Sequence, residues 1–214
     1  MPLPRLIPLF PLPNVVLFPR VLLPLHIFEP RYREMVKDVA AGDELIGMIL
    51  LRGAESSDGS RTDLYSVGCA GRMIRRVDLP DGRSNILLQG VREFVPREQY
   101  FDRPYRVGAV DWLPAPDKEL HLDEARKRCL VERIRGFVGD KQEGLRILND
   151  PTVDDEMLVN LFAFALDVPV AEKQSLLEIP DLLARAERLI EILEFHALER
   201  ECSPALEQAK FRVQ

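Results

Sequence analysis

The sequence predicts an α+β protein in which an N-terminal β barrel with one inserted helix precedes a C-terminal α-helical bundle. Residues 1–113 contain a series of short apolar stretches with the period-two alternation of strands. The run Leu113-Pro114-Ala115-Pro116 ends this pattern, and beyond it the apolar period is close to 3.6. A chain of 214 residues can bury one sizeable core or two modest ones. We expect a β-barrel domain over 1–113, a helical bundle over 117–201 and a flexible tail over 202–214.

The N-terminal part contains six candidate strands, at residues 5–10, 21–28, 44–52, 63–78, 84–95 and 104–113. Between the candidate strands at 63–78 and 84–95, Pro80-Asp81-Gly82 is a typical turn, because proline presets φ and glycine accepts a positive φ. We therefore expect the flanking strands to pair antiparallel. The loop Gly53–Arg61 is rich in serine, aspartate and glycine, which predicts an exposed and mobile segment. Several strands joined by short turns, with a single helix, favour a small closed or nearly closed barrel.

The inserted helix follows the second strand directly. One face of that strand is apolar and consists of Val21, Leu23, Leu25 and Ile27. Pro30 cannot continue a strand ladder, but it suits the first position of a helix. Glu29 can face the free N–H groups at this helix start. We expect the helix to reach Ala41 and to end at Gly42 in a left-handed conformation.

The C-terminal part contains four amphipathic helical patterns with short links, which is typical of a helical bundle. Their apolar stripes run over 122–138, 158–166, 176–177 and 182–193. Thr152, with Asp155 three residues on, predicts a capping box at the start of the second helix. Pro169 begins the third helix, and Pro180 with Asp181 begins the fourth. The chain beyond Glu201 contains Ser203-Pro204 and is expected to fray.

Motifs spread along the chain resemble the N-terminal substrate-binding domain of Lon proteases, above all its stand-alone bacterial form. They occur in the family's order and cover most of the chain. The motifs are Leu6-Ile7-Pro8-Leu9-Phe10-Pro11-Leu12, Val15-Val16-Leu17-Phe18-Pro19, Pro24-Leu25-His26-Ile27-Phe28-Glu29-Pro30-Arg31-Tyr32, Leu45-Ile46-Gly47, Tyr65-Ser66-Val67-Gly68-Cys69-Ala70, Leu88-Gln89-Gly90-Val91-Arg92-Glu93-Phe94 and Glu172-Lys173-Gln174-Ser175-Leu176-Leu177-Glu178.

The resemblance implies a PUA-like β core and a protein that recognises other polypeptides. Its expected partners are unfolded or partly folded chains, with a protease or chaperone as a further candidate. A Lon protease also needs an ATPase module with a G-x-x-x-x-G-K-[ST] loop and a peptidase module with a serine activated by lysine. Neither motif occurs here. We therefore expect a non-catalytic binding protein without a cofactor or a metal, related by family to the ATP-dependent protease La.

The expected site residues belong to the most specific motifs. They are Phe18, Phe28, Glu29, Arg31 and Tyr32. Each either contacts a bound polypeptide or holds the strand-to-helix corner. A sheet edge can hold an extended chain by backbone hydrogen bonds while apolar side chains enter grooves. Apolar residues of the Pro-rich segment are therefore further candidates, either for this surface or for the barrel core: Leu12, Val15, Leu17, Phe18 and Leu22.

Two other functions stay open. Residues 71–106 carry eight arginines against five acids, and PUA-type barrels of other families bind RNA, so an RNA-binding barrel is one alternative. The net charge of −6, most of it in the C-terminal half, argues against general attraction to nucleic acid. A hydrolase with an unrecognised site is the other alternative. The three histidines, His26, His121 and His196, fall in different elements and lack metal-ligand spacing.

The expected location is the cytoplasm, without a membrane anchor. Eight of the first thirty residues are proline, which prevents a continuous apolar helix at the N-terminus. The three cysteines form no C-x-x-C pair, which favours reduced thiols. The sequence does not indicate an oligomeric state.

Overall fold

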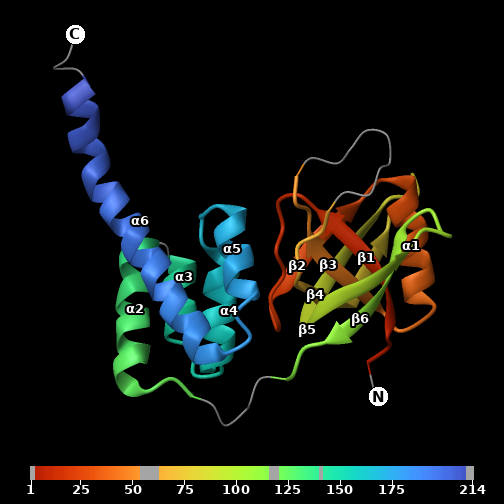
Figure 1. Cartoon of the computed structure of the whole chain (residues 1–214), viewed down its shortest axis with the longest axis horizontal. Helices are drawn as coiled ribbons and strands as arrows, with labels where there is room; N and C mark the ends of the chain where they lie inside the picture. Colours follow the sequence, from red (N-terminus) through yellow and green to blue (C-terminus); the bar gives the residue numbers. More distant parts are fainter. Residues whose placement is uncertain (1–2, 54–62, 116–120, 140–141, 211–214) are drawn as a thin grey trace.

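The structure, a computed structural model, describes residues 3–53, 63–115, 121–139 and 142–210. It combines a mixed six-stranded sheet with helices (Figure 1). The helices that follow the sheet in the chain gather on one side of it, whereas α1 (Pro30–Ala40) lies on the opposite side. The predicted order, strands with one inserted helix and then helices, is therefore confirmed.

Each of the six predicted stretches overlaps one strand of this sheet. The strands are β1 (Leu6–Leu12), β2 (Leu22–Ile27), β3 (Leu45–Leu50), β4 (Gly68–Asp78), β5 (Ser84–Tyr100) and β6 (Arg106–Trp112). Their order is β2-β5-β4-β3-β1-β6, and β5 also pairs with β6. The pairings of β5, β4, β3, β1 and β6 thus form a closed cycle, and β2 is added beside β5. β1 and β3 are parallel, and the remaining pairs are antiparallel.

β5 closes this cycle because it is longer than the sequence predicted. Its first part pairs with β2 and β4, and its last part, from Phe94 to Tyr100, pairs with β6. The prediction ended this strand at residue 95, next to Pro96. A shift in register between Pro96 and Glu98 lets the ladder continue past the proline, which has no N–H to donate.

The buried apolar residues form two clusters. The smaller one takes side chains from every strand of the closed cycle: Ile7, Leu9, Ile49, Ala70, Phe94 and Val110. The larger one joins the sheet, α1 and the C-terminal helices. The hairpin between β4 and β5 turns as predicted, with Gly82 at φ +81° and the Leu79 N–H donating to the Arg83 carbonyl at 2.8 Å.

Both ends of α1 differ in detail from the prediction. Glu29 is the N-cap residue, but its carboxylate makes no capping hydrogen bond and instead accepts one from the Arg31 Nε at 2.9 Å. At the C-terminal end, Ala41 is the cap and Gly42 is not left-handed. Glu44 has the positive φ, +57°, and its N–H donates to the Val39 carbonyl. The reversal of the chain direction is thus completed two residues later, directly before β3.

The C-terminal helices are α2 (Glu124–Val138), α3 (Gln142–Leu148), α4 (Asp155–Ala165), α5 (Val170–Leu177) and α6 (Leu182–Lys210). The sequence prediction missed α3. The predicted capping box at Thr152 is wrong, because Asp154 caps α4 by accepting a hydrogen bond from the Met157 N–H at 2.9 Å. α6 continues through residues 202–210, so the helix does not end at Glu201. Its distal part projects away from the other helices (Figure 1). Residues 54–61 of the predicted mobile loop lie outside the described residues.

A buried ion pair connects the sheet to the C-terminal helices. The Arg185 Nη2 of α6 lies 2.7 Å from the Glu93 Oε1 of β5, and both side chains are almost fully buried. Arg185 also donates to the Asn160 Oδ1 at 2.7 Å and to the Ile179 carbonyl. At the edge of this junction, Gln174 of α5 donates to the Val67 carbonyl at 2.9 Å. Buried polar contacts of this kind fix one arrangement of the two parts.

Candidate functional site

The structure separates the five predicted site residues into an exposed and a buried group. Phe28 is 60% exposed, and Glu29 and Arg31 are partly exposed next to it. Phe18 and Tyr32 are buried. The motif thus places only three of its five members where an incoming chain could touch them.

Tyr32 is buried below the corner between β2 and α1 and packs against the sheet. Its ring lies against the Phe10 ring of β1, with 4.1 Å between the centroids. The Arg31 guanidinium covers the same tyrosine ring at 4.5 Å and bonds to Glu29. A cation over an aromatic face is a favourable contact. Tyr32 therefore positions Arg31, and Arg31 positions Glu29, at the start of α1.

Phe18 has a different location, in the junction between the sheet and the helices. The Arg185 guanidinium lies 5.9 Å from its ring centroid. Two neighbours of Phe18 also contact α4: the Arg20 Nη1 lies 2.6 Å from the Asp154 Oδ2, and the Pro19 carbonyl accepts a hydrogen bond from Asn160. The Pro-rich segment here packs inside the molecule. Of its apolar candidates, Leu17 is also buried, Leu12 and Val15 are half-buried, and Leu22 is exposed.

Exposed apolar side chains gather on the side of β2, β5 and β4 that faces solvent. The register places Pro24, Leu87 and Arg75 in one cross-strand row, and His26, Asn85 and Val77 in the next. Residues paired in this way point to the same side of a sheet. We call this surface the outer face. Its apolar members are Leu22, Pro24, Phe28, Ile74, Val77 and Leu87.

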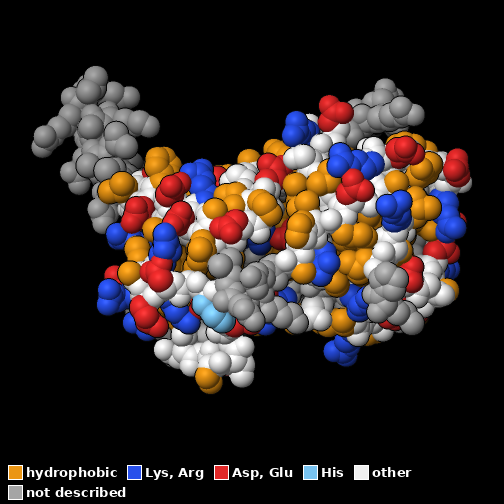
Figure 2. All heavy atoms as spheres, turned by 60° about the horizontal axis from the view of Figure 1, so that its bottom comes forward, with side chains coloured by type: hydrophobic (Ala, Val, Ile, Leu, Met, Phe, Trp, Pro, Cys, Tyr) orange, Lys and Arg blue, Asp and Glu red, His pale blue; other side chains and the backbone are white. Residues whose placement is uncertain are grey.

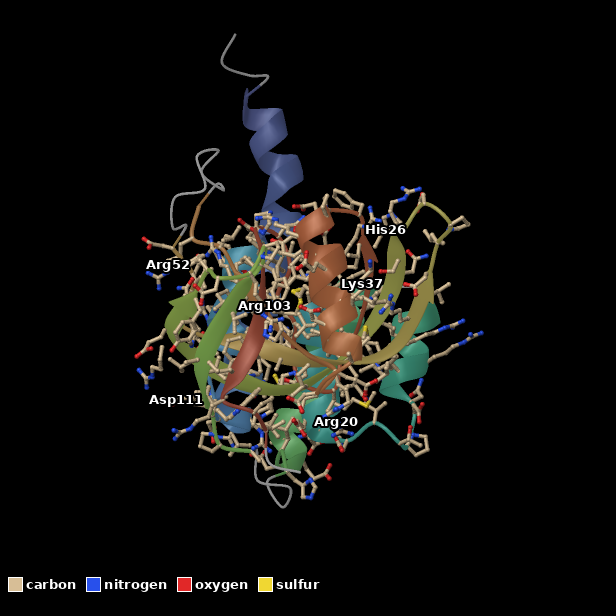
Figure 3. The ribbon with its side chains drawn as sticks, turned by 90° about the vertical axis from the view of Figure 1, so that its right-hand side faces the viewer. Arg20, His26, Lys37, Arg52, Arg103 and Asp111 are labelled. Carbon is tan, nitrogen blue, oxygen red and sulfur yellow. The ribbon has the colours of Figure 1, made fainter. Side chains whose placement is uncertain are left out.

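His26 and Phe28 form the end of the outer face nearest α1. The two rings are stacked with 6.3 Å between their centroids, and the His26 Nδ1 lies 2.7 Å from the Asn85 Oδ1. In Figure 3, His26 lies to one side of α1, beside the β4–β5 hairpin. β2 is the end strand of the sheet order, so the outer face borders a strand edge.

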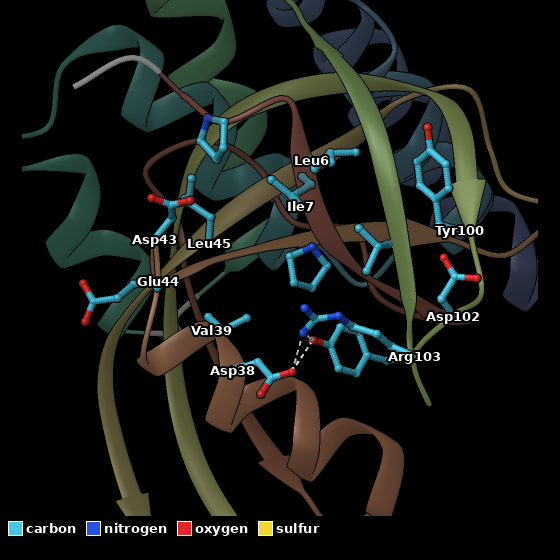
Figure 4. A pocket seen from close by; sticks show the side chains of 15 residues that line it. Leu6, Ile7, Asp38, Val39, Asp43, Glu44, Leu45, Tyr100, Asp102 and Arg103 are labelled. Atoms are coloured by element: carbon cyan, nitrogen blue, oxygen red, sulfur yellow. Dashed lines mark hydrogen bonds and ion pairs between the residues drawn. The ribbon is translucent and has the colours of Figure 1, made fainter.

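A concave surface lies on the other side of α1, and the sequence did not predict it. It is a groove of about 480 Å³ between the C-terminal end of α1, the start of β1 and the loop from β5 to β6. Leu6, Ile7 and Val39 contribute apolar side chains, and Asp43, Glu44 and Asp102 lie at its rim (Figure 4). We call it the acidic groove. Figure 3 places Arg103, which also lines it, across α1 from His26.

One wall of the acidic groove is a hydrogen-bonded triad. The Asp38 Oδ2 accepts hydrogen bonds from the Arg103 Nη1 and from the Tyr105 hydroxyl, both at 2.6 Å (Figure 4). Burial and the hydrogen bond to Asp38 raise the pKa of Tyr105. Its hydroxyl therefore stays protonated at neutral pH and acts as a donor. These residues are far apart in the chain, so no local pattern could have indicated the triad.

Half of the arginines that raised the RNA-binding alternative are paired with carboxylates. Four of the eight form ion pairs of 2.5–2.7 Å: Arg76 with Asp78, Arg83 with Asp81, Arg97 with Asp111, and Arg103 with Asp38. Arg72 donates to the Asp43 carbonyl. Phosphate recognition needs guanidinium groups whose charge is not already neutralised. This pairing weakens the case for a basic face.

The described residues also offer little to the hydrolase alternative. The acidic groove is lined by carboxylates, tyrosines, one arginine and apolar residues, and its described lining includes no serine, cysteine or histidine. Within the described ranges, no group of three or more His, Cys, Asp or Glu side chains is placed to hold a metal ion. Burial raises the pKa of the Cys69 thiol well above its ordinary value, so this thiol is a poor nucleophile.

Among the residues that the structure describes, no helix has both the length and the apolar character needed to cross a bilayer.

The fold is that of an N-terminal domain of a Lon protease. The crystal structure of a Lon N-terminal domain protein from Xanthomonas campestris superposes with a TM-score of 0.65 at 24% identity, covering 87% of this chain and 97% of that one. The N-terminal domain of the Mycobacterium avium complex Lon protease gives a TM-score of 0.66 at 16% identity, covering 89% and 99%.

The family described as the ATP-dependent protease La (LON) substrate-binding domain matches residues 6–194, and the chain belongs to this family. Lon proteases from Parabacteroides distasonis and Cytophaga hutchinsonii are 33% and 28% identical to it, over 92% and 89% of this chain. The chain spans about a quarter of the length of these relatives, 25% and 24% respectively. The resemblance stated from the motifs is thus confirmed.

Proposed function

We propose that this chain binds segments of other polypeptides through the outer face and carries out no chemistry of its own. The observation that carries the proposal is the outer face itself, where apolar side chains stay exposed on three adjacent strands. Phe28, Leu22 and Ile74 are 60%, 48% and 48% exposed. The register places Gln89, Arg75 and Asn85 among these apolar side chains. Figure 2 likewise shows hydrophobic and charged side chains side by side at the surface of the part of the molecule that contains the sheet. A cluster of large apolar side chains that folding leaves exposed is typical of an interaction site.

The edge of β2 decides how such a segment would be held. Within the described residues β2 pairs only with β5, so its other edge offers backbone groups to an extended chain. Pro24 lies in the middle of β2 and has no N–H to donate, which limits a continuous backbone ladder. Side-chain contacts with the outer face would then supply most of the affinity. Binding of this type tolerates many sequences, as a protein that recognises unfolded chains requires.

The motif residues take two roles in this proposal. Phe28, with Glu29 and Arg31 beside it, meets the bound segment, and Phe18 and Tyr32 hold the surrounding structure from within. The closed cycle of strand pairings supports describing the sheet as a PUA-like barrel and the helices after it as a bundle. A cytoplasmic location and a protease or chaperone as further partner belong to the same proposal, because the curated relatives are Lon proteases.

The test is the binding of a fluorescently labelled, reduced and carboxymethylated α-lactalbumin, compared with the native form, by fluorescence anisotropy. We expect the unfolded form to bind and the native form to bind far more weakly. The double variant Leu22→Ser/Phe28→Ser should weaken binding about tenfold or more, since burying each large apolar side chain contributes roughly 1.5–3 kcal/mol.

The matched control is Phe195→Ser/Leu198→Ser on α6. These side chains are 57% and 60% exposed, so the control removes similar apolar area from another surface. Equal losses in both double variants, or no preference for the unfolded protein, would refute the proposal. A nitrocellulose filter assay with a labelled RNA over a salt series tests the alternative, because phosphate contacts give a steep salt dependence.

A further inference from the structure

We propose that the acidic groove is a second binding site, separate from the outer face, for an extended polypeptide segment in which apolar side chains alternate with lysine or arginine. The inference starts from the shape of the groove. Its volume, about 480 Å³, lies within the range of roughly 300–1,000 Å³ that is typical of ligand sites. It can therefore admit side chains rather than only water.

The floor of the acidic groove is apolar. Ile7, Val39 and Leu45 line it and are buried, which gives the groove a rigid base. Leu6 stands at the opening and is 55% exposed, although it belongs to a strand that pairs with β6. An apolar side chain placed against Leu6 would be removed from water together with it, and this burial stabilises the complex.

The rim determines which segments fit. Four carboxylates and one guanidinium line the acidic groove, and the guanidinium, that of Arg103, is already paired with Asp38. Asp43, Glu44 and Asp102 remain. Their carboxylates make no hydrogen bond or ion pair with another side chain in the part of the chain that the structure describes. The lining of the groove thus has a net negative charge, and the nearby Arg72 guanidinium is bonded to the Asp43 carbonyl rather than to its carboxylate.

These carboxylates are divided between the two sides of the groove. Figure 4 shows Asp43 and Glu44 on one side and Asp102 on the other, with Leu6 and Ile7 between them. An extended segment that lies across the floor would meet a negative charge on either side of its apolar contact. In an extended chain, successive side chains point in opposite directions. Charge complementarity therefore selects a segment with basic residues next to apolar ones.

The test uses two carboxylates at the rim and Leu6 at the opening. The probe is a fluorescein-labelled peptide with blocked ends, Gly-Leu-Lys-Leu-Arg-Leu-Gly, and its binding is followed by anisotropy. The double variant Asp43→Asn/Glu44→Gln should weaken binding about two- to fivefold, because exposed ion pairs contribute little each. Leu6→Ser should weaken it by a similar factor. In 0.5 M NaCl, the difference between the wild type and the rim variant should shrink, since salt screens exposed charges.

Two matched peptides separate charge from apolar contact. The peptide with glutamate in place of lysine and arginine should bind at least tenfold more weakly, and so should the peptide with serine in place of leucine. The outer-face variant Leu22→Ser/Phe28→Ser should leave binding of the basic peptide unchanged. Loss of binding in that variant, with the groove variants unaffected, would overturn the groove site and leave the proposed function standing. For unfolded α-lactalbumin, loss of binding in the groove variants with no loss in Leu22→Ser/Phe28→Ser would overturn the outer-face proposal and leave the groove site standing.

Discussion

Replacing Glu93 with alanine should lower the free energy of unfolding by about 3–4 kcal/mol. Glu93 and Arg185 are 6% and 4% exposed, and their charged atoms are 2.7 Å apart. Removing one partner of a buried ion pair costs about 3–5 kcal/mol, because the other charge is left buried without compensation. Arg185 keeps its hydrogen bonds to Asn160 and to the Ile179 carbonyl, which places the expected cost in the lower part of this range.

Urea unfolding measures this cost. With a slope of about 2 kcal/mol per molar urea, the midpoint should fall by about 1.5–2 M. Trp112, the single tryptophan, reports on β6, whereas circular dichroism reports mainly on the helices. Because the ion pair joins the sheet to the helices, both signals should shift together.

The matched control is Asp111→Ala. Asp111 pairs with Arg97 at 2.6 Å, but both side chains are more than half exposed, so this change should cost less than about 1 kcal/mol. The double variant Glu93→Leu/Arg185→Met removes both charges and should recover most of the stability lost in Glu93→Ala. Equal midpoints for Glu93→Ala and Asp111→Ala would show that the buried pair does not connect the two parts as argued.

Three further predictions concern other positions. Gly90→Ala should strongly destabilise the protein in urea unfolding, because a Cβ atom there would lie 2.0 Å from a backbone carbonyl oxygen, whereas Gly136→Ala on α2 meets nothing within 4 Å and should stabilise by up to about 1 kcal/mol. Iodoacetamide labelling followed by peptide mapping should modify the half-buried Cys129 well before the buried Cys69 in the native protein, and both at similar rates in urea. Burial raises the pKa of Asp154, but Arg20 and a backbone N–H lower it more, so the net pKa lies below its ordinary value. The stabilisation is therefore present above the ordinary pKa and is lost as the pH falls through the lowered pKa. In urea unfolding, Asp154→Asn should destabilise the protein more at pH 6 than at pH 2.5.

Local features of the fold could be predicted from the sequence. The turn at Pro80-Asp81-Gly82 and the helix start at Pro30 depend on backbone preferences of the residues themselves, and the structure contains both. The alternation in β2 likewise identifies its buried side, with Leu23 and Ile27 inside. These signals are short in sequence and need no information on the rest of the chain.

Features that depend on distant contacts could not be predicted. The predicted strand ended at residue 95, yet pairing with β6 carries β5 on to Tyr100. Glutamate and arginine usually lie at the protein surface, and only the packing of α6 against the sheet buries Glu93 and Arg185. Phe18 belongs to a motif that predicted a site, but its burial depends on helices that follow 130 or more residues later. The acidic groove could not be predicted for the same reason, because its lining residues are far apart in the sequence.

The positions of the two proposed surfaces on either side of α1 have a consequence for long clients. α1 has 11 residues, so its axis is about 16 Å long. An extended segment rises about 3.3 Å per residue, and some five to eight residues suffice to pass from the Phe28 end of α1 to the Asp43 end. A single unfolded chain could then occupy the outer face and the acidic groove together, and the second contact would form at a high effective concentration. Such a client should lose about tenfold in affinity when the outer face alone is altered and much more when both surfaces are. A short peptide that fits one surface should respond to that surface alone.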